Sequence, residues 1–218
     1  MHLYNSISNH FPQRKSVRLS EYDYSSSGWY FITICTQNHY ELFGKIVDSK
    51  MILNEYGKIV EKVLLKLPQR YKNVELDEYV IMPNHFHGII VINNDDDTDS
   101  VGAGLVPARE MGDYCETGDH KDLSCDHKGR PYTARDNENN KPTIGNITGA
   151  FKSITTNEYI RGVKIKKWTP FNYRIWQRNY YEHIIRNEKS LNKIRQYIID
   201  NPPKWEIDKY NPKNIEKF

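Results

Sequence analysis

The stretch YVIMPNHFHGIIVI, residues 79–92, decides the fold. It consists of an apolar run, a Pro-Asn break and a second apolar run that carries two histidines one residue apart. A Pro-Asn pair between two such runs is typical of a turn, so the sequence predicts a β-hairpin over 74–93. Side chains two residues apart in a strand point to the same face. His85 and His87 should therefore project together, with Phe86 on the opposite face.

The segments around this hairpin show further periodic patterns. Aromatic and β-branched residues favour strands, whereas apolar residues at helical spacing, with prolines as stops, favour helices. The remaining elements are then a strand at 28–38, helices within 54–71 and 143–162, strand-like aromatic segments within 164–186 and a final helix over 187–203. The first six elements follow the order βαββαβ. This order predicts an α+β fold, a ferredoxin-like sandwich with an antiparallel sheet, followed by a C-terminal helix.

Two segments stand outside this pattern in a chain that we expect to form a single domain over 1–218. Residues 95–142 are rich in Asp, Asn and Gly, lack periodicity, and hold twelve acidic and six basic side chains. Irregular runs of this length are uncommon inside compact domains, so we interpret this segment as a mobile surface insertion. Residues 1–20 form a polar, basic N-terminal arm. Residues 152–218 hold fifteen bases against seven acids, an excess that could face phosphate groups.

The composition argues against a membrane protein. No apolar segment approaches the roughly 18 residues that a membrane span needs, and the N-terminus lacks the apolar core of a signal peptide. The three cysteines, Cys35, Cys115 and Cys125, are an odd number without metal-type spacing, which favours reduced thiols. We therefore expect a soluble, cytoplasmic protein.

The histidine pair is the first candidate for chemistry. Two imidazoles on one face begin a divalent metal site but are too few to complete it, and a hydrogen-bonded, partly buried pair is the structural alternative. Tyr197 and Asn201 lie four residues apart in the final helix and so share a helical face. An amide oxygen at that helix end could reach a metal, and a nearby phenol could attack a phosphodiester that the metal polarises. The alternative for these two residues is a core aromatic and a helix cap.

Four blocks of the chain resemble a known family. MPNHFHGII resembles the His-hydrophobic-His signature of the small single-strand DNA transposases, and especially of the REP-associated tyrosine transposases. The resemblance extends over four blocks in the family's order: 14–44, 79–92, 151–159 and 176–202.

The resemblance implies a function and a site. It implies a transposase-like, metal-dependent single-stranded DNA endonuclease and strand transferase, active through a 5′-phosphotyrosine intermediate. The substrate would be single-stranded or hairpin DNA, such as repetitive palindromic elements, and the divalent metal Mg²⁺ or Mn²⁺. The family's positions fall on His85, His87 and Asn201 as metal ligands and on Tyr197 as the catalytic residue of the C-terminal helix.

Alternatives stay open at this point. Tyr180 and Tyr181 are rival nucleophiles, and Glu182 with His183 could form an alternative ligand pair. A domesticated, catalytically inactive DNA-binding protein on the same fold is one further function, and an RNA-binding ferredoxin-like domain is another. The protein could be a monomer or a homodimer.

Basic candidates for DNA contacts are Arg14, Lys15, Arg18, Lys152, Arg174 and Arg178, with Trp176 as a stacking or core residue.

Overall fold

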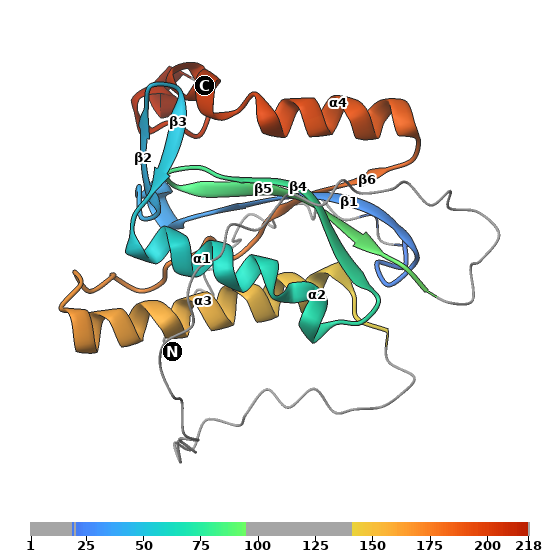
Figure 1. Cartoon of the computed structure of the whole chain (residues 1–218), viewed down its shortest axis with the longest axis horizontal. Helices are drawn as coiled ribbons and strands as arrows, with labels where there is room; N and C mark the ends of the chain where they lie inside the picture. The colour runs from blue at the N-terminus through green and yellow to red at the C-terminus, as the bar shows by residue number, and fades with distance from the viewer. Residues whose placement is uncertain (1–18, 20, 95–140, 218) are drawn as a thin grey trace, which may run out of the picture.

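A computed structural model describes residues 19, 21–94 and 141–217 of the chain (Figure 1). The basic arm with Arg14, Lys15 and Arg18 lies outside the described residues, as does almost all of the expected insertion.

One four-stranded sheet organises the described residues. Its strands are β1 (Gly28–Cys35), β4 (Val74–Ile81), β5 (His85–Ile92) and β6 (Tyr181–Ile185). They lie in the order β4-β5-β1-β6, and every neighbouring pair is antiparallel. This arrangement confirms the α+β fold class with its antiparallel ferredoxin-like sheet, because the hairpin strand β5 and the first strand β1 occupy the centre.

A second, two-stranded hairpin was not predicted from the sequence. It pairs β2 (Gly44–Val47) with β3 (Lys50–Leu53) and stands at one end of the sheet beside the C-terminal segment (Figure 1). Asp48 and Ser49 form its turn with φ values of 48° and 62°, the left-handed geometry of a tight hairpin. Strands of four residues are too short for their alternation to be recognised in a sequence.

The helices cover both faces of the sheet (Figure 1). On one face lie α1 (Glu55–Leu65), the short α2 (Leu67–Arg70) and α3 (Ile144–Lys166). On the other face lies α4 (Glu188–Ile199). The first predicted helix is thus two helices, because Pro68 sits in the first turn of α2, where its missing N–H costs nothing.

Helix α3 continues four residues beyond the predicted end at Gly162. This glycine is used for close packing, since a Cβ atom built on it would lie 2.1 Å from the Trp168 ring. The helix ends instead at Lys167, which adopts the left-handed conformation with φ 58°. Of the strand-like segments expected within 164–186, only β6 is a strand of the sheet.

Alternation along the strands creates two apolar cores. Phe86, Ile90 and Ile32 belong to the larger core between the sheet and the α1 and α3 helices. Phe31 and Ile89 pack in a smaller core on the α4 side. The same alternation assigns His85 and His87 to the α4 side, away from Phe86.

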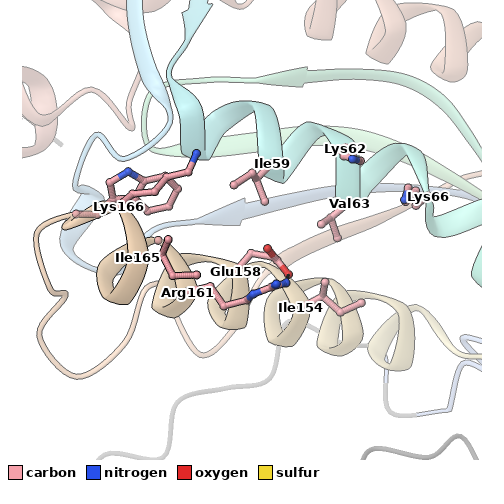
Figure 2. Close-up of a pocket in the computed structure, with 11 residues that line it drawn as sticks. Ile59, Lys62, Val63, Lys66, Ile154, Glu158, Arg161, Ile165 and Lys166 are labelled. Atoms are coloured by element: carbon pink, nitrogen blue, oxygen red, sulfur yellow. Dashed lines mark hydrogen bonds and ion pairs between the residues drawn. The ribbon is translucent and has the colours of Figure 1, made fainter. Parts of the chain in front are cut away.

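A groove of about 710 Å³ runs between α1 and α3 (Figure 2). Ile59 and Val63 of α1 and Ile154 of α3 line it with apolar side chains, and the charged Lys62 and Arg161 line it as well. Because α1 and α3 cover the sheet face opposite to α4, this groove is separated from the two histidines by the sheet.

Candidate active site

The two histidines lie on the central strand β5 and face each other. His85 and His87 are buried, and their Nε2 atoms are 3.1 Å apart. Opposite them on β1 lie Cys35 and Thr33. The pair is therefore held rigidly by the middle of the sheet.

Hydrogen bonds at the outer nitrogens fix the orientation of both rings. The Asn84 amide group donates to the carbonyl oxygens of His39, at 3.0 Å, and Tyr210, at 2.7 Å. Its oxygen therefore accepts from Nδ1 of His85, at 2.8 Å. Nδ1 of His87 lies 2.7 Å from the Thr33 hydroxyl, which can accept in the same way. With both protons on Nδ1, the two Nε2 lone pairs point into one shared space.

This space fits a divalent metal. Two bonds of about 2.1 Å at a right angle would place two nitrogens about 3.0 Å apart, which is close to the separation found here. A carboxylate oxygen of Asp208 joins the pair, and the three ligand atoms lie within 4.8 Å of one another. The buried Oδ1 atom of Asn201 has no hydrogen-bond partner among the described residues. Mixed nitrogen and oxygen donors of this kind suit Mg²⁺ or Mn²⁺.

Asp208 is a candidate ligand that the sequence did not reveal. It follows the 3-10 helix η3 (Pro202–Ile207), beyond the Pro-Pro stop of α4. No periodic pattern leads to this position, and a single Asp in a polar tail has no distinguishing spacing. Its carboxylate reaches the histidines only because the tail folds back over β5.

Tyr197 lies at the open side of the histidine pair. Its hydroxyl oxygen is 3.3 Å from Nε2 of His87, and its ring centroid is 5.2 Å from that imidazole. The side chain is 43% exposed, so the phenol borders solvent while the histidines are buried. One helical turn on, the Asn201 amide group donates to the Tyr197 backbone carbonyl at 3.1 Å. The final helix thus brings Tyr197 to the histidine pair, and Asn201 lies just beyond the end of that helix.

Burial decides the protonation of these groups. It lowers the pKa of His87 to about 3 and the pKa of His85 well below its ordinary value, with a further lowering of both by the Lys209 charge. Both imidazoles are therefore neutral at neutral pH, as metal ligands must be. Burial also raises the pKa of Tyr197, which a hydrogen bond from Asn201 partly opposes. Burial raises the pKa of Asp208, and the backbone N–H of Tyr210 opposes that shift.

Helix α4 is anchored to the sheet on both sides of Tyr197. Leu191 and Ile198 are buried in the smaller core. Arg195 forms a two-pronged ion pair with Asp77 of β4, and its Nε atom donates to the carboxylate at 3.0 Å. Apolar packing and a paired guanidinium together fix the rotation of the helix, and with it the position of the phenol.

The C-terminal tail closes the site. The Tyr210 ring lies 4.6 Å from His85 and 5.9 Å from His39, centroid to centroid. Trp205 is buried, with its ring 6.2 Å from His85. These contacts could not be predicted from the sequence, because they depend on the 3-10 turns that follow α4.

The rival candidates are placed apart. Glu182 and His183 are consecutive in β6, where neighbouring side chains point to opposite faces, so they do not form one ligand pair. Tyr180 packs against the larger core on the far side of the sheet. Tyr181 of β6 is the partner of Thr33 on the neighbouring strand β1, so its side chain lies on the same face of the sheet as the histidines. Of the two rival tyrosines, Tyr181 is therefore the one on the face that carries the candidate site.

The described basic candidates take different positions. Lys152 donates to the three backbone carbonyls of residues 177–179, at 2.9, 3.3 and 3.3 Å. It therefore supports the loop that leads into β6. Trp176 is a core residue, and its indole N–H donates to the Thr155 hydroxyl. Arg174 and Arg178 are exposed on the loop itself.

None of the helices within residues 21–94 and 141–217 combines the length and the apolar composition of a membrane span.

A relative of similar length is found among known proteins. No protein-family model matches the chain. A Haemophilus influenzae protein described as uncharacterized is 37% identical over 205 residues, which cover 94% of this chain and 95% of that protein.

Two solved structures are more distantly similar. The structure of a REP-associated tyrosine transposase bound to a REP hairpin has a TM-score of 0.43 and 19% identity, and the match covers 85% of this chain and 74% of that one. A Deinococcus radiodurans protein provisionally assigned as a transposase has a TM-score of 0.37 and 13% identity, with 86% and 97% covered. These two likenesses are too remote to carry a function to this chain.

Proposed function

We propose that this chain, which belongs to one family with the Haemophilus influenzae protein, is a metal-dependent DNA strand transferase. The description of that relative states no activity, so the proposal is argued from the geometry of the site. In this proposal Tyr197 is the nucleophile. The substrate is single-stranded DNA that carries a hairpin. The observation that carries the proposal is the 3.3 Å approach of the Tyr197 hydroxyl to Nε2 of His87, beside the facing Nε2 atom of His85. The four sequence blocks that resemble REP-associated tyrosine transposases support the same reading.

His85 and His87, together with Asp208 and the amide oxygen of Asn201, are the residues that would hold the ion. A bound Mg²⁺ or Mn²⁺ would supply Lewis-acid polarisation of the scissile phosphate and favour the phenolate form of the tyrosine. The protein keeps both imidazoles neutral by burial, and Thr33 and Asn84 hold their rings in position.

The covalent step belongs to Tyr197. Its hydroxyl oxygen forms a bond to phosphorus while the bond from phosphorus to the 3′-oxygen breaks. The phenol proton leaves to water at the exposed side of the ring, and the departing 3′-oxygen takes up a proton to become a 3′-hydroxyl group. The product is a 5′-phosphotyrosine, which a second 3′-hydroxyl can attack to rejoin DNA and restore the phenol.

The fold is suited to this role because α4 holds the nucleophile in place. The Arg195–Asp77 pair and the apolar contacts of Leu191 and Ile198 fix the helix against the sheet. A positioned nucleophile converts attack on a bound phosphate into an intramolecular reaction, which lowers the entropic part of the barrier.

A trapping experiment tests the proposal. The purified chain is incubated with hairpin oligonucleotides that carry single-stranded flanks of randomised sequence, in Mn²⁺ or in EDTA. We expect a covalent protein–DNA adduct that survives denaturation of the protein. It should form in Mn²⁺ and not in EDTA. Peptide mass spectrometry after nuclease digestion should place the nucleotide on Tyr197. Absence of any covalent species, while the protein binds both Mn²⁺ and the DNA, would overturn the proposal.

A further inference from the structure

A polar hollow of about 690 Å³ lies beside the candidate active site, between two loops. One wall is the turn that contains η1 (Gln37–His39), and the other is the loop 172–179. The two are tied together where Thr36 bridges Trp176 and the Gln37 N–H donates to the Ile175 carbonyl at 2.6 Å. The hollow is therefore a fixed feature of the fold.

The lining of this hollow has the composition of a nucleobase site. Two uncovered aromatic rings face solvent there, since Tyr173 is 93% exposed and Tyr40 is 58% exposed. Side-chain amides with both donor and acceptor atoms also line the hollow, from Asn38, Asn172, Gln177 and Asn179. Unpaired bases are bound in proteins by stacking on rings of this kind and by hydrogen bonds to their edges.

Two arginines complete the lining. Arg174 and Arg178 belong to the same loop and are exposed. Lys152 holds this loop from below through its bonds to residues 177–179. Guanidinium groups at the edge of an aromatic site can neutralise the phosphates that flank a bound base.

The backbone around the hollow is unusual. Asn38, His39 and Tyr173 adopt left-handed conformations with φ values of 54°, 55° and 66°. Such conformations are unfavourable for residues with bulky side chains, and they concentrate at binding and catalytic sites. Tyr173 thus combines a left-handed backbone with a side chain that is almost fully exposed.

Two aromatic rings, those of His39 and Tyr210, link the hollow to the histidine pair. The His39 ring lines the hollow and stacks on Tyr210 at 5.9 Å, and Tyr210 in turn lies 4.6 Å from His85. Gln177 reaches His39 from the loop, with 3.2 Å between its Nε2 atom and Nε2 of the imidazole. The buried Nδ1 atom of His39 has no partner among the described residues.

From these contacts we propose that the hollow binds one unpaired nucleobase of the DNA strand next to the scissile phosphate and so selects the cleavage position. Tyr173 stacks on the base, the amide side chains contact its edge, and Arg174 and Arg178 hold the flanking phosphates. This inference rests on the proposed function, because it presumes a single-stranded DNA substrate at Tyr197.

The test measures coupling between one side chain and one base. A hairpin oligonucleotide is first selected by the wild-type chain from the randomised pool. Each nucleotide of its single-stranded flank is then replaced in turn by an abasic nucleotide, and equilibrium affinity is measured with the Tyr197→Phe protein, which cannot cleave. We expect one position at which loss of the base weakens binding roughly tenfold, the effect of losing one stacked base.

The variant Tyr173→Asn removes the ring and keeps a residue that tolerates positive φ. Combined with Tyr197→Phe, it should bind the intact oligonucleotide roughly tenfold more weakly and become nearly insensitive to the abasic replacement at that position. Tyr173→Phe retains the ring and should behave as the parent. Ile165→Asn alters a side chain of α3 that is 74% exposed and does not line the hollow, and it should also behave as the parent.

Three outcomes would overturn the inference. The first would be that no abasic position affects affinity. The second would be that Tyr173→Asn is as sensitive as its parent to every replacement. The third would be that Ile165→Asn reproduces the loss of affinity. Adduct formation by the chain with an intact Tyr197 is scored separately. An adduct without base coupling contradicts this inference and leaves the proposed function standing, whereas DNA binding without any adduct contradicts the proposed function.

Discussion

The hydroxyl oxygen of Tyr197 lies 3.3 Å from Nε2 of His87, although the two residues are 110 positions apart in the chain. The contact joins the end of the final helix to the centre of the sheet. It places an exposed phenol beside two buried, neutral imidazoles, and the proposed metal-assisted attack on phosphorus rests on this arrangement.

Asp208 should contribute to metal binding. Asp208→Asn keeps the size of the side chain and removes the negative charge next to His85 and His87, so Mn²⁺ affinity should fall at least about tenfold. Calorimetric titration with Mn²⁺ measures the change. Glu206→Gln is the matched control, because that neighbouring carboxylate is exposed and pairs only weakly with Lys213 at 3.8 Å. Equal affinities for Asp208→Asn and wild type would remove Asp208 from the site.

Thr33 should act through His87. Thr33→Val removes the oxygen that lies 2.7 Å from Nδ1 of the imidazole, which frees the ring to turn and to change its tautomer. Loss of such a supporting contact lowers metal affinity by about 10- to 100-fold in comparable sites. Thr33→Ser keeps the hydroxyl group and should retain the affinity of the wild type. A Thr33→Val protein with normal Mn²⁺ affinity would show that the contact does not orient the ligand.

The Arg195–Asp77 pair should hold helix α4 against the sheet. Arg195→Met leaves Asp77 without its partner, and the Asp77 side chain is only 12% exposed. Since Arg195 is itself 37% exposed, we expect a modest loss of about 1–2 kcal/mol in the free energy of unfolding. Urea denaturation measures it. The exposed Arg161 pairs with Glu158 within α3, and Arg161→Met should cost less than about 0.5 kcal/mol. Equal losses for the two variants would contradict the account.

Two glycines of α3 should respond in opposite directions to the same substitution. Gly162→Ala places a methyl group 2.1 Å from the Trp168 ring and should destabilise the protein by about 1–3 kcal/mol. Gly149→Ala meets no atom within 4 Å and should stabilise the helix by about 0.5–1 kcal/mol. Thermal and urea unfolding measure both changes. A stabilising Gly162→Ala would show that Trp168 does not pack against this helix.

The parts of the site that could be predicted from the sequence are those governed by a local period. The two-residue period of β5 separates His85 and His87 from Phe86, and the 3.6-residue period of α4 places Tyr197 and Asn201 on one face. The order of elements likewise predicts the antiparallel sheet with β5 and β1 at its centre.

The remaining parts depend on contacts between segments that have no period. Asp208 and Tyr210 reach the histidines through the tail after α4, which the Asn84 amide binds at the Tyr210 carbonyl. The polar hollow likewise forms where the turn at 37–40 meets the loop at 172–179. Such irregular segments carry no hydrophobic repeat from which their positions could be read.

The measurement that tests the central claim most directly compares covalent adduct formation by the wild-type chain, Tyr197→Phe and Tyr181→Phe on the same hairpin oligonucleotide in Mn²⁺. Tyr197→Phe removes only the attacking oxygen, because the ring that packs 6.0 Å from Phe31 stays. Tyr181 shares the face of the histidines and is the matched control. The account predicts that Tyr197→Phe binds the oligonucleotide and forms no adduct, while Tyr181→Phe forms the adduct as the wild type does. An adduct formed by Tyr197→Phe and lost in Tyr181→Phe would contradict it.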